Sequence, residues 1–440
     1  MRFTCLLLLS TLLPAETPRL PEPYQRIVDL ANSSPPEFAA DALLRVVESA
    51  KIGREPQRDL AEQAFRLSAA AKFPVRMRGM PGSMVDTRSG YLSTAYGLKL
   101  DRLSLQSRAV FDMLPLDKAK ARELFLEIPQ PVLTPLTCDD SLVYEVSDYY
   151  RTLAAVSGTF TEKERAKEDH FKFLLDYIGQ ATSPLQLAPL ARAIKSASVA
   201  PPQREILWNR FSGMLEAMQP DDRSFAASLS ELEHEIPSEA RASFEKYRQK
   251  SQGCKGDAPQ GGFTTDATPS ADRTPKVEPY WQSVATHMLL EGGKRLRFGP
   301  EGKPLTDADR ATREWQQQLT DYLNQLADWS PSQEKSEADY YHQKCVIYEA
   351  LVELIPPSLQ RDEILKGYLS FVGNSNLQQE SPVEWFMHAH SMLERVRSTN
   401  TGEPAKVIEA FRTSGNRVLA LYAMLESTFG GQTPAWVTPN

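Results

Sequence analysis

The side chains best suited to acid–base chemistry lie together at Asp339, Tyr341 and His342. A carboxylate, a phenol and an imidazole that meet in a cleft can act as general acid and base, as in helical-toroid lyases. An Asp-Tyr-Tyr triplet at 148–150 repeats the start of this run 191 positions earlier. The alternative interpretation is structural: one tyrosine packs in a core while the other reaches a hydrogen-bond partner. We favour that interpretation, so the three residues are candidates and no catalytic residue is assigned.

Other motifs for catalysis or cofactor binding are incomplete. The glycine-rich segment 299–303 lacks the spacing of a phosphate-binding loop. S-x-x-K occurs at 243–246 and 332–335 without the S-D-N and K-T-G elements that accompany it in serine enzymes. His342 and Cys345 would share one face of a helix, but two ligands fall short of a zinc site. The sequence therefore predicts no cofactor and no metal ion.

Length and charge exclude some classes of function. The 440 residues include 57 acidic and 50 basic side chains, and 41% are hydrophobic. This length suggests two or three domains with buried cores. The net charge of −7 argues against a nucleic-acid partner, because such proteins gather basic residues on one face.

The first residues have the pattern of an export signal. In 1–15, Arg2 precedes an apolar run at 3–13, and Pro14 and Ala15 end it. This order is typical of a secretory signal peptide, and the run is too short to cross a bilayer. A buried N-terminal helix is the alternative. We predict a periplasmic or extracellular protein with no transmembrane segment after the signal is removed, because no later apolar run is long enough.

Export would leave three cysteines, Cys138, Cys254 and Cys345. In an oxidising compartment two of them could pair. We favour a Cys138–Cys254 disulfide, because Cys138 follows a proline-rich loop and Cys254 follows a predicted helix end. Cys345 falls in a helical stretch, where cysteine often serves as a small buried residue. Three unpaired thiols are the alternative.

Apolar residues recur at three- and four-residue spacing along nearly the whole chain, which predicts helices. The stripe within 38–47 is the clearest, and 57–71 repeats it. Capping signatures of the form S/T-x-x-E/Q predict helix starts at 34–37, 161–164 and 183–186, the second helix running to about Gly179. The best strand signal, Lys294–Phe298 between glycines, predicts one small hairpin. The fold class is therefore all-α.

Composition divides the chain into two helical regions. Of the 29 residues at 251–279, 14 are Gly, Pro, Ser or Thr, which predicts a flexible linker. It separates an N-terminal region, 19–250, from a C-terminal region, 280–430. Tyr177 and Tyr368 keep the 191-residue offset of the two Asp-Tyr-Tyr triplets, which suggests a duplicated helical module.

Two stretches have a pattern typical of paired, capped helices: Leu103-Ser104-Leu105…Arg108-Ala109-Val110 and the run Asp117–Phe125. In this the chain resembles TPR/HEAT-like α-solenoid proteins, built of stacked helical hairpins. The regular 34-residue TPR pattern is missing, so an irregular bundle is the alternative. The resemblance implies a curved surface for binding proteins or peptides, and it carries over no catalytic residue.

Together these observations predict an exported helical-repeat protein that binds another macromolecule, a protein or peptide, non-covalently. The alternative is a helical-toroid hydrolase or lyase that acts on polysaccharide or peptide through Asp339, Tyr341 and His342. A purely structural envelope component is a third hypothesis. Convergence of the three candidates in a deep cleft would favour the enzyme, and a shallow surface with dispersed polar groups would favour the binder.

Overall fold

The computed structural model describes most of the chain. The described residues are 20–79, 88–250, 254, 293–299, 301–330, 337–375, 382–398 and 402–430, without the side chains of 88–91 and 337–339. The predicted signal peptide, 1–15, lies outside the described residues. So does the predicted linker, 251–279, apart from Cys254.

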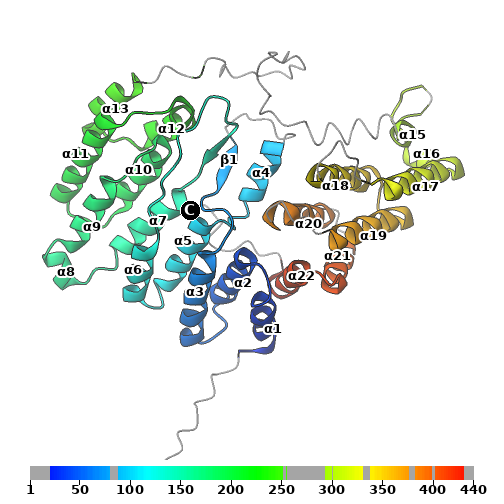
Figure 1. The fold of residues 1–440 in the computed structure, drawn as a ribbon, viewed down its shortest axis with the longest axis horizontal. Helices are drawn as coiled ribbons and strands as arrows, with labels where there is room; N and C mark the ends of the chain where they lie inside the picture. Colours follow the sequence, from blue (N-terminus) through cyan, green and yellow to red (C-terminus); the bar gives the residue numbers. More distant parts are fainter. Residues whose placement is uncertain are drawn as a thin grey trace, which may run out of the picture.

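Helices account for nearly all regular structure in the N-terminal region (Figure 1). They are α1 Glu22–Ala31, α2 Pro36–Glu48, α3 Arg54–Ser68, α4 Arg88–Tyr96, α5 Arg102–Met113, α6 Lys118–Glu127, α7 Ser147–Ser157, α8 Glu162–Ala166, α9 Asp169–Ile178, α10 Leu187–Ser196, α11 Pro201–Ala217, α12 Asp222–Glu235 and α13 Arg241–Arg248. Two short 3₁₀ helices, Pro184–Gln186 and Ser238–Ala240, precede α10 and α13.

The C-terminal region is also helical. Its described helices are α15 Lys294–Arg297, α16 Asp307–Arg310, α17 Arg313–Asp328, α18 Glu337–Leu354, α19 Leu359–Asn374, α20 Pro382–Arg397, α21 Glu403–Thr413 and α22 Arg417–Phe429. Within the described ranges, the only sheet is one antiparallel pair, β1 Met77–Gly79 with β2 Leu142–Tyr144, in which Met77 faces Tyr144. The all-α prediction is confirmed.

The helices stack side by side in a curved row (Figure 1). Neighbouring contacts run from α13 through α11, α9, α7, α5, α3 and α2 to α1, and then continue from α1 to α22, α21 and α19. The first helix of the chain therefore lies inside the row, between α2 and α22. The core follows the apolar stripes of these helices, as in α2, where Phe38, Leu43 and Val47 are buried.

A buried arginine joins α2 to α5. Arg108 Nη1 donates to Asp41 Oδ1 (2.6 Å), while Nε and Nη2 donate to the two oxygens of Glu48 (2.6 and 2.9 Å). Arg45 Nε also donates to Asp41 (3.0 Å), and Arg45 lies 3.6 Å from Glu426 on α22. This arginine–carboxylate network ties three helices of the row together.

Helix starts confirm some of the predicted caps and correct others. Thr161–Glu164 and Ser183–Gln186 both form reciprocal capping boxes. The cap predicted at Ser34 is wrong: α2 begins after Pro35, and the Ser34 hydroxyl donates to Leu30 O at the end of α1 (2.9 Å). The short α1–α2 connection leaves this hydroxyl closer to the preceding helix than to the next one.

Two predicted elements differ from the structure. The single helix expected from Thr161 to Gly179 is broken at Glu168, whose φ of 63° is left-handed. This break turns α9 so that Leu174 and Ile178 are buried. The gain from burial outweighs the helix propensity of the residues around Glu168. Lys294–Arg297 is the short helix α15, in which Leu296 is buried and its carbonyl accepts a hydrogen bond from Trp315 Nε1 (3.3 Å). Of the predicted hairpin, one antiparallel bridge between Phe298 and Pro304 is present.

Cys138 and Cys254 form the disulfide that the sequence analysis favours, with their Cα atoms 5.5 Å apart. It joins the loop after α6 to the chain just beyond α13, across 116 residues of sequence. Cys345 is a free, buried thiol. Within the described ranges, none of the helices combines the length and the apolar character needed to cross a bilayer.

We expect Cys138→Ser to lower the free energy of unfolding by about 2–5 kcal/mol, because the open chain regains the loop entropy that the crosslink removes. Urea denaturation monitored by circular dichroism measures the change. The double variant Cys138→Ser/Cys254→Ser is the control, and it should lose no more than the single variant. An unchanged midpoint in Cys138→Ser would contradict a stabilising role for the bond.

Candidate functional site

The three sequence candidates belong to α18, but two of them are buried. Tyr341 is 1% exposed and His342 is 2% exposed. The backbone of Asp339 lies in the same helix, and its side chain is outside the described residues. A group that acts on a substrate must touch it, so the burial of Tyr341 and His342 removes them from any reaction at the surface.

His342 belongs to a chain of buried hydrogen bonds between α18 and α20. His388 Nδ1 donates to Glu349 Oε1 (2.8 Å), since a carboxylate accepts and cannot donate. His388 Nε2 forms a hydrogen bond with His342 Nδ1, 2.8 Å away. Glu349 also forms an ion pair with Arg395 on α20 (3.3 Å). We call His342, His388, Glu349 and Arg395 the buried imidazole chain.

Tyrosines surround this chain. Tyr341 Oη donates to Trp385 O (3.2 Å), and Tyr368 Oη on α19 donates to His388 O (2.7 Å). Cys345 lies beside both hydroxyls, and burial raises the pKa of its thiol well above the usual value. A thiol held in its neutral form is a poor nucleophile. These groups satisfy one another and fix how α18, α19 and α20 pack.

The earlier triplet has the same structural role at a separate place. Tyr149 is buried and stacks on Phe125 with 5.2 Å between ring centroids, and Tyr150 Oη accepts from Gln186 Nε2 (3.1 Å). Asp148 forms ion pairs with Lys99 (3.2 Å) and Arg76 (3.4 Å). Helix α7, which carries the triplet, packs on α5, α6, α9 and α10. The two Asp-Tyr-Tyr sequences therefore do not meet in one site.

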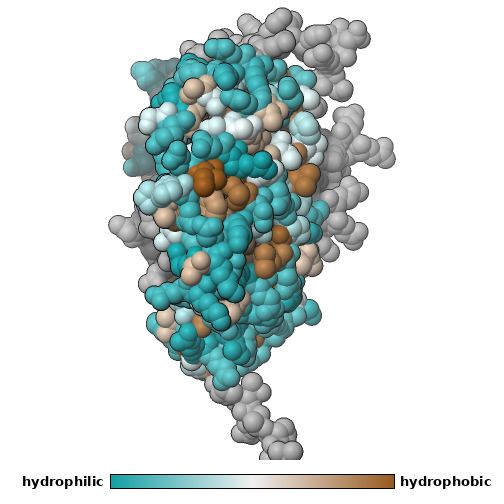
Figure 2. All heavy atoms as spheres, turned by 90° about the vertical axis from the view of Figure 1, so that its left-hand side faces the viewer, coloured by the Kyte–Doolittle hydropathy of each residue, from teal (hydrophilic) through white to brown (hydrophobic). Residues whose placement is uncertain are grey.

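The described residues offer no assembled metal centre. Among them, no group of three or more His, Cys, Asp or Glu side chains is arranged to hold an ion. The end of the row at α11 and α13 presents a largely hydrophilic surface, with apolar side chains in small separate patches (Figure 2). One exposed apolar residue of α11 is Ile206.

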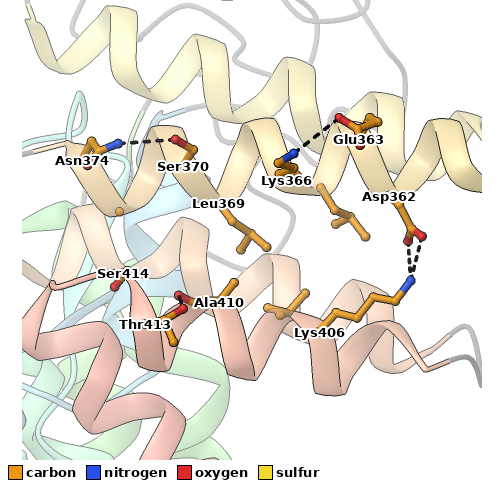
Figure 3. A pocket seen from close by; sticks show the side chains of 13 residues that line it. Asp362, Glu363, Lys366, Leu369, Ser370, Asn374, Lys406, Ala410, Thr413 and Ser414 are labelled. Atoms are coloured by element: carbon orange, nitrogen blue, oxygen red, sulfur yellow. Dashed lines mark hydrogen bonds and ion pairs between the residues drawn. The ribbon is translucent and has the colours of Figure 1, made fainter.

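An open groove of about 520 Å³ lies between α19 and α21 (Figure 3). Apolar side chains of Leu365, Leu369, Val407 and Ala410 line it. At one end the helices come close, because a Cβ built on Gly373 would lie only 3.3 Å from Ser414 Cβ. We call this cavity the α19–α21 groove.

Polar groups stand at both ends of the groove. Lys406 Nζ forms a bidentate ion pair with Asp362 across the two helices (2.8 and 2.7 Å), as Figure 3 shows. At the other end, the Asn374 amide donates to Ser370 Oγ (3.4 Å) and the Thr413 hydroxyl donates to Glu409 O (2.9 Å). No histidine or cysteine lines the groove. An apolar floor with polar ends can hold apolar side chains and orient their backbone.

Sequence analysis does not find this groove. Leu365 and Leu369 follow the same spacing as Ile364 and Tyr368; Leu365 is buried like those two residues, and Leu369 is half-buried. The apolar face of α19 is therefore broad, and only its neighbours decide which part of it borders a groove.

The chain matches no protein-family model, and neither a curated protein nor a solved structure is similar to it. The resemblance to α-solenoid proteins thus concerns the arrangement of helices alone.

We expect His342→Ala to lower the free energy of unfolding by about 1–3 kcal/mol, because His388 Nε2 loses its buried hydrogen-bond partner. Urea unfolding measures this change. His234→Ala is the matched control, since His234 is exposed on α12, and it should change stability by less than about 0.5 kcal/mol. Equal effects of the two substitutions would contradict a structural role for the buried imidazole chain.

Proposed function

We propose that this protein binds a protein partner non-covalently, and that the α19–α21 groove receives a segment of that partner. The groove itself is the observation that carries the proposal. Its volume of about 520 Å³ lies in the range of ligand-binding clefts, and its floor is apolar between two polar ends. Paired helices that leave a groove between them commonly bind peptide segments through apolar anchors.

The geometry supports binding better than hydrolysis or lyase chemistry. The enzyme hypothesis needs Tyr341 and His342 at the wall of a cleft, whereas both are buried in the packing of α18 on α20. The carboxylate of Asp362 at the groove is held by Lys406 through both of its oxygens.

The binding proposal is tested by capture of partners on the immobilised protein, followed by affinity measurement with the captured protein. We expect Leu369→Glu to weaken binding at least about tenfold, because a charge would enter the apolar floor. Leu359→Glu is the matched control: Leu359 lies on the same helix, is highly exposed, and does not line the groove. It should bind like the unmodified protein.

Circular dichroism and the melting temperature show whether Leu369→Glu is folded. Full affinity in a folded Leu369→Glu variant would exclude the groove as the binding site. Capture of no partner above the level retained by a protein-free matrix would count against the binding function itself.

We also propose that the protein is exported. The Cys138–Cys254 disulfide supports this, since such bonds persist in oxidising compartments outside the cytosol. We expect mass spectrometry of the secreted protein to show a chain that begins near Glu16, after removal of the predicted signal peptide. Retention of Met1 on soluble protein from the cell exterior would contradict signal cleavage.

A further inference from the structure

The two helical regions meet at a joint formed by α1, α2 and α4 on one side and α20 and α22 on the other. Aromatic rings cross it: Phe38 packs edge to face on Phe386 with 5.0 Å between centroids, and Tyr24 lies 6.3 Å from Phe429. Arg417 Nη1 also donates to Ser33 O (3.3 Å). We call this contact the inter-region joint.

Glu426 of α22 is the central charge of the joint. It is buried, and it forms ion pairs with Arg45 of α2 (3.6 Å) and with Arg397 of α20. Both arginines carry further carboxylates, Asp41 for Arg45 and Glu394 for Arg397. Every charge here has a partner, so an additional positive charge would compete for carboxylates that are already in use.

A small cavity of about 40 Å³ remains inside the joint. Side chains from both regions line it, including Phe38, Asp41 and Arg45 from one side and Phe386, His390 and Tyr422 from the other. At roughly 10–15 Å³ for the smallest site that holds one water molecule, this volume has room for only a few. The joint therefore leaves a cavity beside the ion pairs of Asp41 and Arg45.

His390 of α20 lines this cavity. Its Nδ1 lies 2.9 Å from Tyr422 Oη, and burial lowers the pKa of its imidazole. The charged groups that act on it come from three helices: Arg45 on α2, Glu426 on α22, and Glu394 and Arg397 on α20. Asp41 of α2 lines the same cavity.

Helices α4, α18, α19 and α21 also pack on α20, and none of their described side chains lines this cavity. The connection after α4 lines the cavity with Leu98 and Leu100, and Lys99 between them forms an ion pair with Asp148 (3.2 Å). On α18, Glu349 faces His388, which lies two residues from His390 and so on another side of α20.

We propose that the inter-region joint is a pH-sensitive contact that loosens in mild acid when His390 takes up a proton. A protonated imidazole needs hydration or a free carboxylate, whereas the closed joint offers a small cavity and carboxylates that two arginines already hold. Separation of α20 and α22 from α1 and α2 would admit water to the charged ring. His390 binds a proton less readily in the folded protein than in the open chain. The free energy that keeps the joint closed therefore falls as pH drops below about 6.5.

Hydrogen exchange of the mature protein at about pH 7.5 and pH 5.5, corrected for the intrinsic rate, tests the proposal. We expect α1 and α22 to lose protection at the lower pH while α9 and α11 keep theirs. His390→Gln, which cannot be protonated, should retain protection of α1 and α22 in acid. His170→Gln is the matched control, because burial also lowers the pKa of His170 but this residue lies on α9, away from the joint.

Equal protection of α1 and α22 at both pH values would overturn the proposal, as would an acid-induced loss that persists in His390→Gln. Small-angle scattering provides an independent measurement, and the maximum dimension should increase in acid for the unmodified protein. If His390→Gln does not fold, His390→Asn serves as the second variant that cannot be protonated. The result does not depend on whether the α19–α21 groove binds a partner.

Discussion

The fold depends on how Arg108 is neutralised inside it. Burial alone would lower the pKa of this guanidinium, but Glu48 and Asp41 outweigh that effect and raise it, so the charge persists in the core. Removal of one member of such a buried pair costs about 3–5 kcal/mol, since the remaining charge is left without a partner. Asp41 also accepts a hydrogen bond from Arg45, and Arg45 forms an ion pair with Glu426 at the joint between the two regions. One desolvated cation thus sets the positions of α2, α5 and, indirectly, α22.

In the C-terminal region, hydrogen bonds between buried polar groups have the same purpose. Apolar stripes alone allow neighbouring helices to slide or rotate, because dispersion contacts have little direction. The buried imidazole chain and the tyrosine hydroxyls require specific donors opposite specific acceptors, so only one arrangement of α18, α19 and α20 satisfies them. The histidines and tyrosines that suit acid–base chemistry in the sequence therefore specify how the helices pack. The groove between α19 and α21 is lined by leucine, alanine, lysine and aspartate, which give no such signal.

Local signals in the sequence are enough to predict the helices and many of their ends. The stripe in α2 and the capping box at Thr161 depend on residues three or four positions apart, and both are present in the structure. The break at Glu168 and the helical state of Lys294–Arg297 depend on what α9 and α15 bury, which no short window of sequence contains. Similarly, the types of Tyr341 and His342 are compatible with catalysis, and only their burial separates that role from a structural one. The Cys138–Cys254 pair could be favoured by elimination, but its distance is a property of the folded chain.

The place of α1 inside the row has a consequence for the order of biosynthesis. Tyr24 packs near Phe429, which leaves the ribosome 405 residues later. One side of α1 therefore stays uncovered throughout translation, while α2 and α3 can already associate with each other. Closure of so long a loop is slow compared with formation of local hairpins. The nascent chain must keep this apolar edge soluble until α22 emerges. A repeat array assembled strictly from one terminus to the other would not face that requirement.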